Sequence, residues 1–239
     1  MVLGLVPARG GSKGVPRKNI RLLAGRPLLE YTARAAIESE VLDRVVLSTD
    51  SEEIAGIGRR VGLDVPFMRP AALAEDDTPM IAVVRHAIDA LDERGWRADI
   101  VVLLQPTSPL RRPEHVRAAV RLLRDTNADA VVTVVEMPRH LSPDYVMRIE
   151  DGRLKPFLSE GAAITRRQDA RPAYWRDGTV YVCWRRTIER FNSLYGDDCR
   201  PLLIDAADAL SIDSAADWDA ADRVLKERLS GVPVDRANR

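Results

Sequence analysis

Short apolar runs alternate with segments of helical periodicity along most of the chain. Uninterrupted hydrophobic runs predict buried strands, which we place at 2–6, 44–48, 99–105, 129–136 and 178–184. Apolar residues at three- and four-residue spacing predict helices, which we place at 28–37, 51–61, 81–91, from Pro113 onward, and at 215–229. Strands that lack polar alternation are buried on both faces, so the pattern predicts an α/β fold with a mainly parallel central sheet covered by helices.

The alternation stops after Glu136. The next segment reads MPRHLSPDYVMRIEDGRLKPF, in which Asp151-Gly152 predicts the turn of a β-hairpin. We therefore treat the chain, 1–239, as one domain that is interrupted by a β-rich excursion at 137–177. A lone hairpin is marginally stable, and a monomer would leave this one's apolar side chains in water. We expect the excursion to form the interface of a homodimer through Leu141, Tyr145, Val146, Met147, Leu154 and Phe157.

Composition narrows the classes of partner. Lys+Arg and Asp+Glu both total 36 among 239 residues, so the net charge is zero and no basic field points to nucleic acid. Aromatic residues make up only 5% of the chain, which argues against a base-stacking surface. No apolar run has the length of a membrane span, and the chain starts directly with a strand-like segment instead of a signal peptide. With two cysteines and no metal-binding spacing, we expect a cytoplasmic protein with reduced thiols.

The first loop carries the clearest chemistry. Residues 8–19 read ARGGSKGVPRKN and directly follow the first strand, at the edge of the sheet where α/β proteins bind ligands. Three glycines free the backbone N–H groups, and Arg9, Lys13, Arg17 and Lys18 add positive charge. This combination predicts a cradle for phosphates. Neither the Walker A spacing nor the dinucleotide-binding glycine pattern is present, which argues against the usual ATPase and dehydrogenase interpretations.

Six motifs in order resemble one family. ARGGSKGVPRKN is followed by LSTDSEEIA, RPAALAEDDTP, LLQPTSPLR, RRQD and SIDSAADW. Together they resemble the acylneuraminate cytidylyltransferases, the CMP-sialic acid synthetases, over nearly the whole chain. The resemblance implies a Rossmann-like nucleotidyltransferase domain, a dimerisation excursion, and CTP and Mg²⁺ as substrate and cofactor. It also implies transfer of CMP from CTP to the anomeric hydroxyl of a sialic-acid-like nonulosonic acid, with release of pyrophosphate.

The resemblance also assigns roles to residues. It implies three catalytic cations, Arg9, Lys18 and Arg166. It implies nucleotide contacts from Gly10, Gly11, Ser12, Lys13, Asn19 and Arg69. It implies substrate contacts from Gln105, Thr107, Ser108, Arg111, Arg167 and Gln168, and a metal ligand in Asp213. Fixed cations suit this reaction, because negative charge builds on the α-phosphate and on the leaving pyrophosphate. Thr107 and Ser108 are equally compatible with shaping a turn, and Arg111 with a solvent-exposed helix start.

The chain departs from the family pattern in three places. Pro79, Met80 and Ile81 replace the small hydroxyl residues that usually follow the Asp-Thr pair. Trp175 and Asp177 stand where arginine and asparagine are common, which leaves the sugar acid open. Ser211 replaces the first aspartate of an Asp-Ile-Asp motif, so that Asp213 alone would hold the metal; Mg²⁺ needs only one or two protein carboxylates when phosphates and waters supply the rest. Ser214 and Asp217 predict a capping box for the last helix.

Two other functions fit the same residues. One is a nucleotidyltransferase that uses a sugar 1-phosphate and another nucleotide. The other is a catalytically weak, CTP-binding regulatory homologue, which the loss of a carboxylate at Ser211 favours. The sequence names no general base.

Overall fold

The computed structural model describes residues 1–11, 14–159 and 166–230. Its central sheet has six strands in the order β10-β6-β9-β5-β1-β4. Their bounds are β1 Val2–Pro7, β4 Arg44–Ser48, β5 Ile100–Leu103, β6 Ala130–Glu136, β9 Tyr174–Trp184 and β10 Cys199–Leu203. β1 is parallel to β4 and β5, and β6 is parallel to β10, whereas β9 runs antiparallel between β5 and β6. The prediction of a mainly parallel sheet is confirmed, with β9 as the reversed strand.

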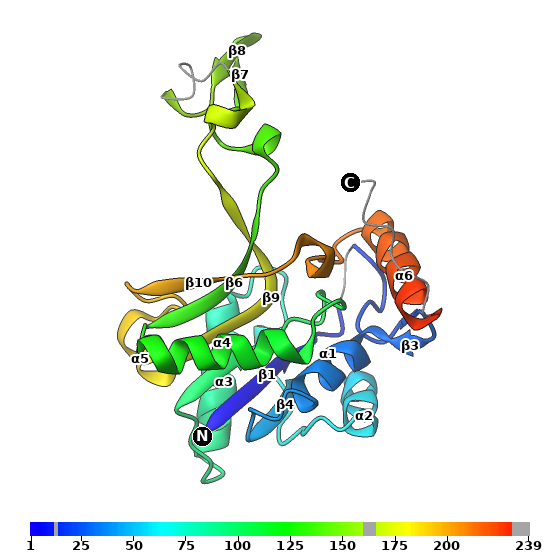
Figure 1. Ribbon diagram of the computed structural model, residues 1–239. Coiled ribbons are helices and arrows are strands. Elements are labelled where there is room, and N and C mark those ends of the chain that lie inside the picture. The colour runs from blue at the N-terminus through cyan, green and yellow to red at the C-terminus, as the bar shows by residue number, and fades with distance from the viewer. Residues whose placement is uncertain (12–13, 160–165, 231–239) are drawn as a thin grey trace.

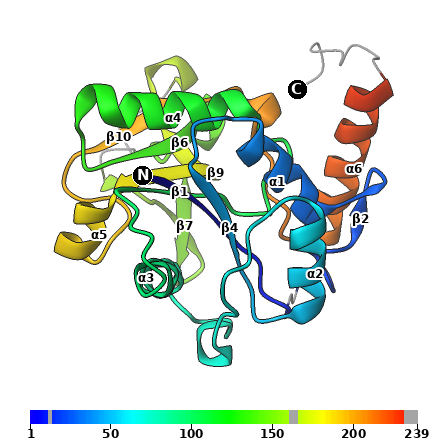
Figure 2. The ribbon, with the colours of Figure 1, turned by 90° about the horizontal axis from the view of Figure 1, so that it is seen from below.

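Helices cover both faces of this sheet. They are α1 Leu28–Ile37, α2 Glu52–Arg60, α3 Met80–Asp92, α4 Pro113–Thr126, α5 Arg185–Phe191 and α6 Ala215–Ser230. Figure 2 shows α1 and α4 on one side of the sheet and α3 and α5 on the other. The alternation of side chains along a strand explains this division. Within β1, Val2 and Val6 join the core under α1 and α4, while Leu3 and Leu5 join the core under α3.

A third, smaller core docks α6 onto the body. Its residues come from the first loop, from the short strands β2 Leu22–Leu23 and β3 Arg26–Pro27, and from α6 itself. Ile212 and Trp218 contribute the largest buried side chains from the C-terminal segment, and Arg21 stacks over the ring of Trp218 at 4.7 Å. The C-terminal segment is thereby held beside the first loop of the chain, as Figure 1 shows.

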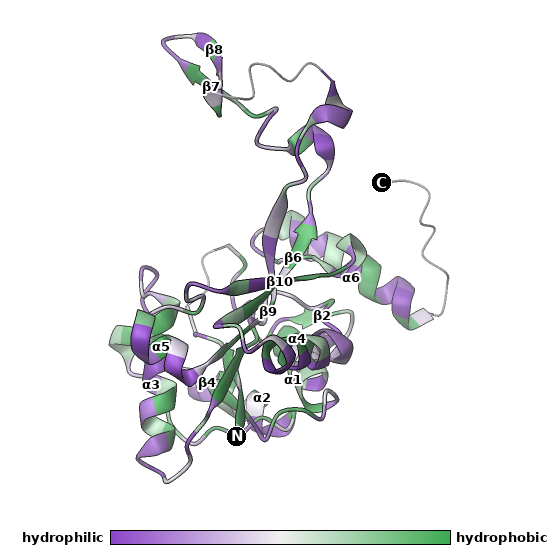
Figure 3. Ribbon diagram, turned by 60° about the vertical axis from the view of Figure 1, so that its left-hand side comes forward, coloured by the Kyte–Doolittle hydropathy of each residue, from purple (hydrophilic) through white to green (hydrophobic). Residues whose placement is uncertain are grey.

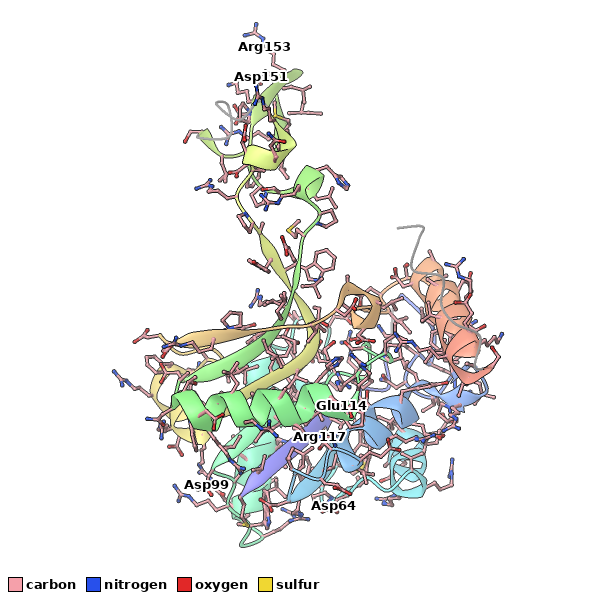
Figure 4. All side chains as sticks on the ribbon, in the orientation of Figure 1. Asp64, Asp99, Glu114, Arg117, Asp151 and Arg153 are labelled. Carbon is pink, nitrogen blue, oxygen red and sulfur yellow. The ribbon has the colours of Figure 1, made fainter. Side chains whose placement is uncertain are left out.

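The excursion forms an arm that projects from the body (Figure 1). β6 continues into the arm and β9 returns from it, and Met137 N donates a hydrogen bond to Ala173 O at 2.8 Å where the two strands leave the sheet. The predicted hairpin is confirmed as β7 Met147–Glu150 and β8 Arg153–Pro156, and Asp151 and Arg153 mark its tip in Figure 4. Short 3₁₀ turns, η2 Arg139–Leu141 and η4 Arg167–Asp169, lie at the base of the hairpin.

The junction between the sheet and the arm is irregular. Val132 pairs with Tyr181, but Val134 pairs with Arg176, so β9 carries extra residues opposite Thr133. The Thr133 hydroxyl accepts from Val180 N at 2.9 Å in place of a regular ladder bond. Gly178 adopts a φ of +85°, which strains any residue with a side chain. The strand predicted at 178–184 therefore begins earlier, at Tyr174, beyond this bulge.

Candidate active site

An open pocket of about 350 Å³ lies at the carboxyl edge of β1, where the first loop meets the loop after β5. Its walls include many of the residues that the sequence pattern assigns to the site: Arg9, Gly11, Lys18, Asn19, Arg69, Gln105, Thr107 and Asp213. Pro7, Gly14, Met80 and Pro106 complete its lining. Segments that are far apart in the sequence thus form one polar site.

The first loop is shaped by close backbone contacts. A Cβ on Gly14 would lie 2.1 Å from the carbonyl oxygen of Asp213, so only glycine fits there. Gly10 N donates to the carboxylate of Asp50 at 2.9 Å, which gives Asp50 a role in holding the loop. Ser12 and Lys13, expected to bind the nucleotide, lie outside the described residues.

Hydrogen bonds from the side chains of Lys18 and Asn19 hold the first loop in place. The Lys18 ammonium donates to the carbonyl oxygen of Ile212 at 2.8 Å, and its Nζ lies 3.9 Å from Oδ1 of Asp213. Burial lowers the pKa of Lys18, and the negative charge of Asp213 partly opposes that shift. The buried Asn19 amide donates to Arg9 O at 3.0 Å. Asn19 therefore supports the loop as well as lining the pocket.

Two arginines hold the segment before α3 in place: Arg9 ties it to the first loop, and Arg69 ties it to the end of β4. The Arg9 guanidinium forms an ion pair with Asp76 at 2.5 Å and donates to Ala74 O at 3.3 Å. Arg69 is buried and donates from Nε to the Ser48 hydroxyl at 3.0 Å and from Nη2 to Ser48 O at 2.5 Å. Burial lowers the pKa of Arg69 to about 10, so its charge persists at neutral pH. Arg9 and Arg69 thus add two guanidinium groups to the pocket that Lys18 also lines.

The loop after β5 divides its residues between the pocket and the core. Gln105 and Thr107 line the pocket, whereas Ser108 is buried and its hydroxyl makes no hydrogen bond within the described part of the chain. Arg111 is also buried, with its guanidinium bound to Thr179 O, the Thr32 hydroxyl and Gln105 O at 2.6–2.7 Å.

Arg111 therefore departs from both interpretations of the sequence, substrate contact and exposed helix start. Burial lowers the pKa of Arg111 to about 9, opposed by the nearby charge of Asp177, so the group stays cationic at neutral pH. Each of its three nitrogens donates one hydrogen bond to the protein, so Arg111 ties the pocket loop to α1 and β9.

Asp213 offers its carboxylate to the pocket. Its side chain is 75% exposed, and one oxygen accepts from the Ser211 hydroxyl at 3.2 Å. Asp217, by contrast, accepts from Asp213 N, Ser214 N and the Ser214 hydroxyl at 2.7–3.1 Å, which lowers its pKa. The predicted capping box of α6 is confirmed, since Asp217 N also donates to the Ser214 hydroxyl.

The described residues contain no cluster of three metal-ligating side chains. Among the described residues that line the pocket, Asp213 is the one carboxylate, and a single carboxylate suits Mg²⁺ that takes its other ligands from phosphates and water.

The residues of the RRQD motif lie elsewhere. Arg166 and Gln168 are on the arm, where η4 sits against η2, and the structure does not bring them to the pocket of their own chain. The position of the Arg167 side chain lies outside what the structure describes. The roles that the resemblance implies for Arg166 and Gln168 therefore stay a prediction, because the structure places both residues on the arm.

Several contacts escaped the sequence patterns. Asp76 pairs with Arg9, Met80 provides an apolar wall, and the backbone of Ile212 anchors Lys18. The sequence shows the adjacent aspartates of AEDD and the PMI segment that follows. It does not predict which cation the aspartates pair with or which cavity the methionine lines.

Comparison with known proteins connects this site to a family. A sequence profile described as Cytidylyltransferase matches residues 3–192. A CMP-N,N'-diacetyllegionaminic acid synthase from Legionella pneumophila is 35% identical over 228 residues, which cover 94% of this chain and 96% of that protein. A pseudaminic acid cytidylyltransferase from Campylobacter jejuni is 32% identical over 75% of this chain and 76% of that protein. An N-acylneuraminate cytidylyltransferase from Escherichia coli is 28% identical over 95% of this chain and 52% of its own length.

Solved structures share the fold at low sequence identity. A CMP:2-keto-3-deoxy-manno-octonic acid synthetase in complex with CTP superposes with a TM-score of 0.72 at 15% identity, covering 95% of this chain and 99% of that one. A 4-diphosphocytidyl-2C-methyl-D-erythritol synthase from Anaerococcus prevotii gives a TM-score of 0.63 at 17% identity, covering 94% and 98%. These likenesses establish the Rossmann-like nucleotidyltransferase fold.

Proposed function

Because this chain belongs to the cytidylyltransferase family, we propose that it transfers CMP from CTP to the anomeric hydroxyl of a sialic-acid-like nonulosonic acid and releases pyrophosphate. Relatives named for legionaminic, pseudaminic and N-acylneuraminic acids support this substrate class. The observation that carries the proposal is the convergence of Arg9, Lys18 and Asp213 on one pocket at the carboxyl edge of the sheet.

The reaction needs positive charge beside the triphosphate, and Arg9 and Lys18 supply it in the pocket. The anomeric oxygen bonds to the α-phosphorus while the bond from that phosphorus to the bridging oxygen of the β-phosphate breaks. The hydroxyl proton is released to solvent, and the electron pair leaves with pyrophosphate. Arg9 and Lys18 stabilise the negative charge on the triphosphate. Hydrogen bonds to the protein hold both cations in position before the substrate binds, so they need no rearrangement during the reaction. The Gln105 side chain lines the same pocket, and in this proposal its amide orients the sugar acid.

The proposal includes Mg²⁺ as cofactor. Asp213 would hold it, because its carboxylate is open to the pocket while that of Asp217 is used in capping. When bound, Mg²⁺ supplies charge neutralisation at the phosphates. Lys18 balances the charge of Asp213 at 3.9 Å and keeps that carboxylate beside the first loop.

We also propose a homodimer formed through the arm. Ile149 and Leu154 are paired across the hairpin and are 76% and 69% exposed, and Met147 and Phe157 are exposed at the end of the same hairpin away from its turn. Figure 3 shows apolar residues of β7 at the far end of the arm. Arg166 and Gln168 lie on this arm, so any contact they make with substrate requires the pocket of a second copy.

The setting that we propose is the cytoplasm, where CTP is available and free thiols stay reduced. Cys183 and Cys199 are both unpaired. Within the described residues, no helix combines the length and the apolarity needed to cross a bilayer.

Pyrophosphate release tests the proposal directly. The protein is incubated with CTP, Mg²⁺ and, separately, N-acetylneuraminic, di-N-acetyllegionaminic, pseudaminic and 3-deoxy-manno-octulosonic acids; reactions without acid and with ATP, GTP or UTP serve as controls. We expect pyrophosphate with CTP and at least one nine-carbon acid. Release only with a sugar 1-phosphate, or CTP binding without any release, would overturn the proposal and favour one of the two alternative functions.

A further inference from the structure

A buried carboxylate outside the pocket joins three elements. Asp208, at the end of η5 Ala206–Asp208, has a side chain that is only 7% exposed. Its Oδ2 forms an ion pair with Arg112 at 2.5 Å and lies 3.5 Å from Nε2 of His115. Its Oδ1 accepts from Arg228 at 2.9 Å. Three cationic or donor groups thus surround one buried anion.

The partners of Asp208 lie on two helices, α4 and α6, and each helix follows a segment that lines the pocket. Arg112 and His115 stand at the start of α4, directly after the loop that carries Gln105 and Thr107. Arg228 belongs to α6, the helix that follows Asp213, and it also donates to Ala207 O at 2.8 Å. His115 is itself oriented, because its Nδ1 accepts from Arg112 N at 3.3 Å and leaves Nε2 toward the carboxylate. The Asp208 contacts therefore fasten the C-terminal segment to the substrate-side loop.

A second attachment follows four residues later. Ile212 N donates to Thr107 O at 2.9 Å, its side chain is fully buried, and its carbonyl oxygen accepts from Lys18. Asp213 comes next, and its backbone N–H donates to Asp217 at 3.1 Å. Among the described residues, its exposed carboxylate accepts from the Ser211 hydroxyl and lies 3.9 Å from the Lys18 ammonium. The position of that carboxylate depends on how firmly 208–212 is held.

We propose that Asp208 is a positioning residue for Asp213. The contacts of Asp208 with Arg112, His115 and Arg228, which we call the clamp, lie outside the pocket and set its affinity for Mg²⁺ and CTP through the position of Asp213. This inference rests on the proposed function, because it assigns Asp213 to the metal. A carboxylate that is misplaced by about 1 Å in such a site lowers catalytic efficiency by as much as about 100-fold. Since one anchor, Ile212, remains after the clamp is broken, we expect a smaller effect.

The test is the variant Asp208→Asn, which keeps the shape of the side chain and removes its charge. We expect the dissociation constant for CTP in saturating Mg²⁺, measured by isothermal titration calorimetry, and the Mg²⁺ concentration for half-maximal binding each to rise about tenfold, the scale of coupling between contacting groups. Asp92→Asn is the matched control. Asp92 forms a two-bond pair with Arg185 at 2.6–2.8 Å near the opposite edge of the sheet, so its loss lowers the melting temperature without changing either binding constant.

Arg112→Gln is a second variant for the case in which Asp208→Asn does not fold. The Arg112 side chain is half exposed, so its removal leaves the core intact and we expect a change in the same direction as for Asp208→Asn. A folded variant that has a lower melting temperature but unchanged CTP and Mg²⁺ affinities would overturn the proposal. A wild-type protein that binds CTP but transfers no CMP would instead overturn the proposed function, while the binding measurements would still decide the role of Asp208.

Discussion

The ammonium of Lys18 donates to the carbonyl oxygen of Ile212 at 2.8 Å, across 194 positions of sequence. This bond joins the loop after the first strand to the segment before the last helix. Because a backbone carbonyl occupies one donor of the ammonium, the charge is fixed beside the pocket before any ligand binds. The electrostatic part of the site is therefore preorganised by a contact between the two ends of the fold.

Removal of the fixed cations should cost activity more than stability. We expect Lys18→Ala and Arg9→Ala each to reduce kcat/KM for CTP by at least about 100-fold, the scale for losing a preorganised charged contact. Steady-state pyrophosphate release measures the effect, and circular dichroism checks the fold. Arg34→Ala, which removes an exposed helical ion pair with Glu38, is the control that should keep normal turnover. Turnover close to wild type in both pocket variants would refute the phosphate cradle.

The lowered pKa of Lys18 gives a prediction for pH. The cationic form binds phosphate, and it is lost as pH rises through a pKa that burial has moved below 10.5. kcat/KM for CTP should therefore fall on the alkaline side at a lower pH than an ordinary lysine would give, because this ratio reports the free enzyme. Lys18→Arg should move the fall to higher pH, since the guanidinium keeps its charge. An identical alkaline limb in both proteins would assign the fall to another group.

Asp213→Asn should abolish turnover, because the amide cannot replace the carboxylate as a ligand for Mg²⁺. Its melting temperature should stay near that of the wild type, since the side chain is 75% exposed. Asp217→Asn is the contrasting variant: it loses capping bonds to Ser214 and Asp213 and should mainly lower the melting temperature. If Asp213→Asn retains the normal rate and Mg²⁺ dependence, the metal is held elsewhere.

Ser211→Asp should strengthen metal binding. The Ser211 hydroxyl already lies 3.2 Å from the Asp213 carboxylate, so an aspartate there would place a second carboxylate at the same site. We expect a lower Mg²⁺ concentration for half-maximal rate, measured by titration at fixed CTP. Ser214→Asp provides the comparison, because the Ser214 hydroxyl is engaged with Asp217 instead. An unchanged or higher Mg²⁺ requirement in Ser211→Asp would argue against metal at Asp213.

Light scattering at micromolar concentration should give the mass of a dimer. The double variant Ile149→Lys, Leu154→Lys should give a monomer, because it places two like charges on the exposed cross-strand pair of the hairpin. Leu22→Lys, at a position that is 62% exposed on the body, should remain dimeric. A monomeric wild type would remove the arm as an interface and, with it, any place for Arg166 in a second pocket.

Local patterns predicted most of the helices and strands. The helix predicted at 28–37 and the strand at 44–48 are confirmed residue for residue, and Pro113 is the first residue of α4 as expected. These boundaries follow from side-chain periodicity and from the fixed φ of proline, which are properties of neighbouring residues. The start of β9 was missed because YWRD lacks an apolar run, and its antiparallel place between β5 and β6 depends on partners far away in sequence.

The candidate site was predictable to the same extent. Glycines and cations that follow a strand form a pattern of neighbouring residues. The sequence could therefore assign Arg9 and Lys18 to the site, and both line the pocket. Arg111 could not be assigned, because its burial depends on carbonyl groups of Thr179 and Gln105 that meet it only in the folded chain. The separation of Arg166 from the pocket likewise depends on the path of the arm, which leaves the sheet beyond a bulge in β9.

That bulge lies where the arm meets the pocket. β6 and β9 continue from the sheet toward the arm, and Gly178 stands in the irregular stretch between the two paired parts of β9. A Cβ at Gly178 would lie 3.5 Å from both Gln105 Oε1 and the Ser108 hydroxyl, beside the wall of the pocket. The glycine backbone at the root of the arm is therefore a neighbour of the Gln105 amide, so a side chain introduced at Gly178 would change both the bulge and the lining of the pocket.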